Sequence, residues 1–175
     1  MAVPQEVPKR SRDLTLPPRI NSQATMDTPQ LSSLYQQLIL EHYRNPRNKA
    51  ELEEKTVEIH MANPVCGDEI RLQLRIEDDH ITEAKFIGQG CSISQAAISM
   101  MTTLLQGRRL DEADALAKRF TEMMHGDEDA GNDKALGDLR ALKGVSKFPV
   151  RIKCALLGFD ALQEALKKNV GPGAH

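Results

Sequence analysis

The chain has 175 residues, a length that predicts one domain with a sizeable core. Its formal net charge is −2, with 27% charged and 40% hydrophobic residues, so the composition gives no reason to expect nucleic acid as a partner. The sequence has no apolar run long enough to cross a bilayer and no apolar signal-peptide segment at its start, so we expect a cytoplasmic protein without a membrane partner.

Residues 1–27 are rich in proline and show no apolar period, which predicts a disordered N-terminal tail. Basic residues in this segment leave a transit peptide open, but Glu6, Asp13 and the prolines argue against one. Met26 is an alternative start. We expect a single domain over residues 28–170 and a flexible C-terminus over 171–175.

The first predicted helix begins at Pro29 and ends before Asn45 and Pro46, with one apolar face that reaches His42. Three segments then alternate apolar and polar residues, 57–61, 70–76 and 81–87. Such alternation is typical of antiparallel strands with one buried face. A short polar turn over 77–80 predicts a hairpin between the second and third strands.

Further helices are predicted after the strands. Gly88 and Gly90 allow a tight turn, and Cys91 then lies at or near the N-cap of a helix with one apolar face. A helix over 110–124, an acidic solvated loop over 125–133 and a short helix ending near Gly144 come next. The fold class is therefore α+β, a small three-stranded antiparallel sheet with about five helices packed on it.

The last helix is predicted over 146–168. Its core stripe consists of Phe148, Ile152, Ala155, Phe159, Leu162 and Leu166. Cys154 lies off this stripe, on a second apolar strip with Val150, Leu157 and Ala161. The basic neighbours Arg151 and Lys153 favour the thiolate form of Cys154.

Three cysteines without an export signal indicate reduced thiols rather than a disulfide framework. Cys66 and Asp68 share a tight loop before the middle strand, and Cys91 follows the strand paired with it. Because these positions meet at one edge of a hairpin, we expect them to lie close together, with Cys154 laid over them by the last helix. Three thiolates and a carboxylate suit zinc. Asp68 as a simple turn cap and Cys91 as a small core residue remain alternatives.

Four stretches carry a resemblance to a known family: 34–48, 63–68, 88–94 and 144–155. The chain resembles the U-type iron–sulfur cluster assembly proteins, the IscU/SufU (NifU-like) family, whose fold is α+β. Scaffold proteins of the IscU branch carry a histidine directly before the third cysteine, where this chain has Lys153. The long segment between Cys91 and Cys154 is also similar to that of the SufU branch.

The resemblance implies a zinc-dependent sulfurtransferase that works with a SufS-type cysteine desulfurase. The zinc ligands would be Cys66, Asp68, Cys91 and Cys154. Cys66 would accept the persulfide sulfur and pass it to a downstream acceptor of the assembly machinery. Arg151 and Lys153 are candidates for partner contact. Two alternatives stay open, an iron–sulfur cluster scaffold and a non-catalytic module whose zinc only holds the fold.

Overall fold

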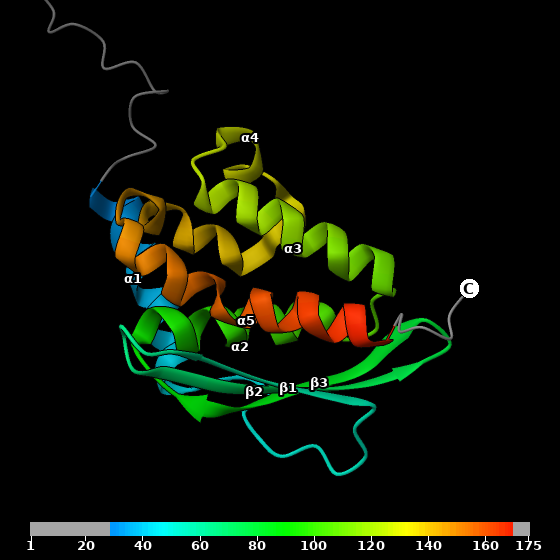
Figure 1. The fold of residues 1–175 in the computed structure, drawn as a ribbon. Coiled ribbons are helices and arrows are strands. Elements are labelled where there is room, and N and C mark those ends of the chain that lie inside the picture. Colours follow the sequence, from blue (N-terminus) through cyan, green and yellow to red (C-terminus); the bar gives the residue numbers. More distant parts are fainter. Residues whose placement is uncertain (1–28, 170–175) are drawn as a thin grey trace, which may run out of the picture.

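The structure is a computed structural model that describes residues 29–169. Its elements, in chain order, are α1 (Pro29–Arg44), β1 (Val57–Asn63), β2 (Asp68–Glu77), β3 (His80–Gln89), α2 (Ser92–Leu105), α3 (Leu110–Met124), α4 (Glu128–Gly131), η2 (Lys134–Lys147) and α5 (Pro149–Asn169). The predicted α+β class is confirmed, with the helices gathered on one face of the sheet (Figure 1).

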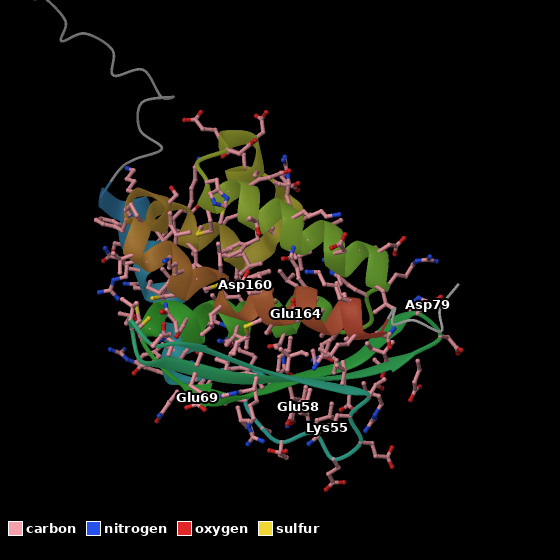
Figure 2. All side chains as sticks on the ribbon, in the orientation of Figure 1. Lys55, Glu58, Glu69, Asp79, Asp160 and Glu164 are labelled. Atoms are coloured by element: carbon pink, nitrogen blue, oxygen red, sulfur yellow. The ribbon has the colours of Figure 1, made fainter. Side chains whose placement is uncertain are left out.

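The sheet has the order β1-β2-β3, and both strand pairs are antiparallel. Ile70, Leu72 and Phe86, which face inward from β2 and β3, are at most 1% exposed. The opposite face carries charged residues, among them Glu58 and Glu69, which point away from the helices (Figure 2). The alternation that predicted these strands therefore separates an apolar buried face from a polar one, on which Gln73 alone of β2 is fully buried, beneath the segment of Leu52.

The helical layer packs mainly through α2 and α5. α5 contacts β1, β2 and α2, and its Phe159 stacks on Phe120 of α3 with ring centroids 4.2 Å apart. The large apolar residues Leu116, Phe120, Met123 and Met124 of α3 are all buried. These contacts make one continuous core between the sheet and the helices.

A stripe of buried polar residues on α2 faces the segment that follows α1. Ser99 Oγ accepts the Arg47 N–H at 2.8 Å and lies 2.8 Å from His42 Nδ1. Thr102 Oγ1 accepts from Asn48 Nδ2 at 3.2 Å. His42 is 2% exposed, which confirms it as part of a packed helix end. The Asn48 carbonyl in turn accepts a hydrogen bond from Phe86 N of β3 at 3.0 Å. Lys49 forms an isolated parallel β-bridge with Phe86.

The structure corrects the prediction for α5. Cys154, Leu157 and Ala161 of the second strip are 0%, 5% and 0% exposed, because α5 is buried on two sides, against α2 and against β1. Only Val150 of that strip is exposed. Phe148, predicted to begin the core stripe, is 60% exposed because α5 begins one residue later and Phe148 has an extended backbone.

Two smaller corrections concern the segment before α5. The acidic loop holds the one-turn helix α4, which buries Ala130. The short helix is of the 3₁₀ type and bends at Gly137, whose φ of 50° lies in the left-handed region. Within 29–169, no helix combines the length and apolar character needed to cross a membrane. The predicted tail (1–27) and C-terminal segment (171–175) lie outside the described residues.

Candidate metal centre

The turn between β1 and β2 places Cys66 and Asp68. Asn63 and Asp68 face each other as the last pair of the β1–β2 ladder, and the loop between them contains Gly67 with a φ of 69°. Asn63 closes this loop with its own groups: its carbonyl accepts Cys66 N at 3.3 Å and its side-chain Oδ1 accepts Val65 N at 3.2 Å. The loop is thereby held in a shape that turns Cys66 back toward the helices.

Asp68 ties this turn to the start of α2. Its carboxylate is 1% exposed, and Oδ1 accepts the Cys91 N–H at 2.8 Å. Cys91 is the N-cap of α2, as predicted, and its Sγ accepts Ser94 N at 3.4 Å. Cys91 Sγ lies 3.9 Å from Asp68 Oδ2. Cys91 Sγ is thus in contact with both the Ser94 N–H and the Asp68 carboxylate.

Cys154 completes the cluster from α5. Its Sγ lies 3.0 Å from Cys66 Sγ, and its side chain is fully buried. Burial raises the pKa of the Cys154 thiol far above its usual range, and hydrogen bonding with Cys66 and Asp68 raises this pKa further. The expectation that Arg151 and Lys153 favour the thiolate of Cys154 was therefore wrong: both side chains are exposed, and without a metal ion the buried Cys154 thiol would stay protonated at neutral pH.

The ligand atoms of Cys66, Asp68 and Cys154 all lie within 4.8 Å of one another. The fourth predicted ligand, Cys91, contacts this group through Asp68. The turn after β1, the start of α2 and the first half of α5 converge at one end of the sheet, on the left in Figure 1. Arg151 and Lys153 are exposed on α5, outside the cluster.

Two residues of the site were not recognised from the sequence as parts of it. Asn63 continues the inward alternation of β1, so a polar residue at an inward position was the available signal. Gly90 was expected to supply backbone freedom, but its backbone is not in the left-handed region. What it supplies is space, because a Cβ there would lie 2.5 Å from Asp68 Oδ1 and 2.6 Å from Ser94 Oγ.

The donor set determines which metals this centre could hold. Thiolates are soft ligands, and a tetrahedral set of cysteines with one carboxylate or histidine is typical of zinc, whereas calcium and magnesium take oxygen ligands. Cys66, Cys91, Cys154 and Asp68 therefore fit zinc by ligand type and number.

Comparison with known proteins places this centre in a family. Residues 34–169 match the family described as the NifU-like N-terminal domain. The chain belongs to this family. The matched range includes all three cysteines and Asp68, so the whole cluster lies inside the family domain.

Relatives of this chain are named for two different functions. The chain is 49% identical over 142 residues to the zinc-dependent sulfurtransferase SufU of Bacillus subtilis, covering 81% of this chain and 95% of the relative. It is 40% identical over 144 residues to the iron–sulfur cluster assembly scaffold protein IscU of Streptococcus pyogenes, covering 82% and 89%. Both the sulfurtransferase and the scaffold activities therefore occur among similar chains.

Solved structures support the same fold. A putative scaffold protein for the SUF system from Fervidobacterium islandicum is 32% identical, with a TM-score of 0.68, covering 74% of this chain and 94% of that chain. A crystal structure titled as a hypothetical protein, 40% identical, has a TM-score of 0.72 and covers 77% and 98%. The small sheet with helices on one face is thus shared by members of this family.

Proposed function

We propose that this protein is a zinc-dependent sulfurtransferase of iron–sulfur cluster assembly, with Cys66 as the residue that accepts sulfur. The observation that carries the proposal is the cluster of Cys66, Asp68 and Cys154, to which Cys91 is attached through Asp68. The name of the Bacillus subtilis relative supports it. A cytoplasmic location, where thiols remain reduced, suits such a centre of free cysteines.

Zinc would be held by Cys66, Asp68, Cys91 and Cys154. When bound, it would supply the positive charge that keeps these thiols deprotonated at neutral pH. The buried carboxylate of Asp68 also fixes the start of α2 by accepting a hydrogen bond from Cys91 N. The ligands on the turn and on the helix therefore keep their positions relative to each other.

The chain's own residues favour Cys66 as the nucleophile. Cys66 is partly exposed on a loop, whereas Cys91 is anchored as a helix cap and Cys154 is fully buried on a long helix. Cys66 sulfur would attack the outer sulfur of a donor persulfide. A new S–S bond forms on Cys66, the donor S–S bond breaks, and the donor leaves as a thiol with no net oxidation.

The donor we propose is a SufS-type cysteine desulfurase, and the sulfur then passes to a downstream acceptor of cluster assembly. Arg151 and Lys153, exposed on the turn of α5 that carries Cys154, are placed to contact such a partner. Their positive charge would steer an acidic surface toward the cluster.

The test compares the native chain with Cys66→Ala and Cys154→Ala. Zinc content, melting temperature and the turnover of a cysteine desulfurase are measured for all three. We expect the native chain to hold zinc and accelerate the desulfurase. Cys66→Ala should stay folded and retain weaker zinc binding through the other ligands, yet give no acceleration. Cys154→Ala should lose both zinc and stability, since it empties a buried position.

A Cys66→Ala protein that still accelerated the desulfurase fully would rule out Cys66 as the acceptor. Zinc without any acceleration by the native chain would indicate a structural centre. The scaffold activity is a second candidate because of the Streptococcus pyogenes relative. Anaerobic reconstitution with iron and sulfide, in competition with zinc, tests it, and a stable cluster passed intact to an acceptor would favour the scaffold.

A further inference from the structure

One buried nitrogen beside the metal centre has no hydrogen-bond partner. Among residues 29–169, two buried side-chain nitrogens lack a partner, Asn63 Nδ2 and Gln95 Nε2. Gln95 lies on α2, where its Oε1 faces Lys49 Nζ at 3.5 Å. Asn63 ends β1, is 9% exposed and directly precedes the loop of Cys66. A buried amide without an acceptor is destabilising, so its presence next to a reactive centre calls for an explanation.

The strand register places this amide at the cluster. Asn63 is the cross-strand partner of Asp68, so the two side chains leave the sheet on the same face. Opposite residues in an antiparallel pair have Cβ atoms about 5 Å apart. One carboxylate oxygen of Asp68 in turn lies within 4.8 Å of Cys66 Sγ and Cys154 Sγ. The Asn63 carbonyl also accepts Cys66 N at 3.3 Å, so Asn63 is next to both Cys66 and Asp68 of the cluster.

The orientation of the carboxamide is fixed by the loop itself. Asn63 Oδ1 accepts Val65 N at 3.2 Å, which uses the acceptor and leaves the two N–H groups of Nδ2 free. No cysteine sulfur is in hydrogen-bonding position for Nδ2 while the cysteines are thiols. A persulfide on Cys66 extends that side chain by one S–S bond, about 2 Å, toward its surroundings.

We propose that Asn63 Nδ2 donates a hydrogen bond to the terminal sulfur of a persulfide on Cys66, and that Asn63 is thus a sulfur-binding residue of the transfer reaction. The inference rests on the proposed function, because it needs Cys66 to carry sulfur. The terminal sulfur of a persulfide anion carries the negative charge, and a hydrogen bond to a charged acceptor is stronger than one between neutral groups. Asn63 Nδ2, which has no hydrogen-bond partner while Cys66 is a thiol, gains one when Cys66 carries a persulfide.

The consequence is a longer-lived sulfur on Cys66. Attack by a thiol on the outer sulfur forms a persulfide on the attacking thiol and returns the Cys66 thiol, whereas attack on the inner sulfur leaves a mixed disulfide on Cys66 and releases hydrogen sulfide. In both cases the S–S bond of the Cys66 persulfide breaks and Cys66 loses its sulfane sulfur. Stabilising the anionic terminal sulfur lowers its tendency to react with passing thiols in solution. It leaves transfer to a docked acceptor possible, because that acceptor can replace the Asn63 hydrogen bond with its own donors.

The experiment uses the zinc-loaded full chain and inorganic polysulfide as a sulfur donor that needs no partner protein. Asn63→Asp keeps an acceptor for Val65 N but has no N–H and adds a charge. Asn63→Ser also keeps an acceptor, without the charge, but is too short to reach the sulfur. Asn45→Ser is the matched control, since Asn45 is exposed and its Nδ2 already bonds Glu41 Oε2 at 3.2 Å.

Zinc content, melting temperature, the sulfane sulfur on Cys66 released by cyanide, and the rate of its loss to a small thiol are measured. We expect both Asn63 variants to keep zinc and to lose the sulfur about tenfold faster than the native chain, the effect of one charged hydrogen bond. Asn45→Ser should match the native chain. Equal loss rates in all proteins, or loss of zinc from both Asn63 variants, would overturn the role of Asn63. A native chain that takes up no sulfane sulfur would instead overturn the proposed function.

Discussion

Gly90 separates the end of β3 from Cys91, and nothing larger fits there. A Cβ at this position would lie 2.5 Å from Asp68 Oδ1, the atom that accepts Cys91 N, and 2.6 Å from Ser94 Oγ. Real Cβ atoms do not approach oxygen so closely, so the Asp68 carboxylate and the Ser94 hydroxyl would both have to move. Asp68 can therefore occupy its observed position only because residue 90 has no side chain.

Gly90→Ala should displace Asp68 from the cluster and weaken zinc binding. We expect a zinc dissociation constant about tenfold higher or more, and an unfolding free energy lower by about 1–3 kcal/mol. Titration with a coloured zinc chelator and urea unfolding measure the two effects. Gly144→Ala is the control, because a Cβ there meets nothing within 4 Å, and it should leave zinc affinity unchanged. Equal zinc affinity in the Gly90 variant would show that Asp68 tolerates the displacement.

Part of the centre was predictable at the level of single residues. Cys66 and Asp68 were placed together by the hairpin pattern, and Cys91 by the helix start, since both follow from local periodicity. The free Nδ2 of Asn63 and the crowding at Gly90 were not predictable, because each depends on the distance between segments that are remote in sequence.

At the scale of elements, α2 has two different buried faces. One is apolar, and the other carries Ser99 and Thr102, which bond the segment after α1. The Ser99 hydroxyl accepts Arg47 N and can donate to His42 Nδ1, which leaves His42 Nε2 to donate to Asp138 Oδ2 at 3.0 Å. The Ser99 hydroxyl thus bonds His42 of α1 and the backbone N–H of Arg47. His42 in turn bonds Asp138 of η2.

Ser99→Ala should be more destabilising than the loss of one oxygen atom indicates. It leaves His42 Nδ1 without a partner in a buried place, which costs about 1–3 kcal/mol, and it removes the acceptor of the part-buried Arg47 N–H. We expect the unfolding free energy to fall by about 2–4 kcal/mol, measured by urea denaturation. Thr103→Ala, an exposed position on the same helix, should change it by less than about 0.5 kcal/mol. A Ser99 variant as stable as the Thr103 variant would mean that water replaces the hydroxyl.

The helices and strands were largely predictable from the sequence. Which face of each element is buried was not always predictable. The strands and the helix at Leu110–Met124 followed directly from their periods. For α5 the sequence has two apolar strips, and periodicity alone does not say which one meets a neighbour. Because α5 lies between α2 and β1, both strips are used, and the exposed apolar residues are instead Phe148 and Val150 near its start.

At the scale of the whole molecule, the centre connects three segments that are distant along the chain. Cys66 and Asp68 come from the turn after β1, Cys91 from the start of α2 and Cys154 from α5. A metal ion bound to all of them would link the sheet to the two helices that cover it. Binding to the folded chain alone stabilises that state by mass action.

Removal of zinc should therefore lower the melting temperature of the whole domain. At free zinc 100 times its dissociation constant the stabilisation is about 2.7 kcal/mol, which corresponds to about 5–10 °C for a chain of this size. The chain has no tryptophan, so circular dichroism or calorimetry is the suitable measurement. Cys154→Ala is the control, since a chelator should have little effect on a protein without the complete centre. An unchanged melting temperature after chelation of the native chain would contradict the assigned ligands.

The short bridge between Lys49 and Phe86 has a consequence for how copies of this protein behave in a crowded solution. The outer strand of a sheet offers unpaired N–H and C=O groups to any passing strand, which is a common route to aggregation. Here the Phe86 N–H on the outer side of β3 is already taken by the carbonyl of Asn48. Asn48 adopts a φ of 62°, a left-handed conformation that asparagine tolerates, and Thr102 holds its side chain. Asn48 and Lys49 therefore block the outer edge of β3 at Phe86 against pairing with another chain.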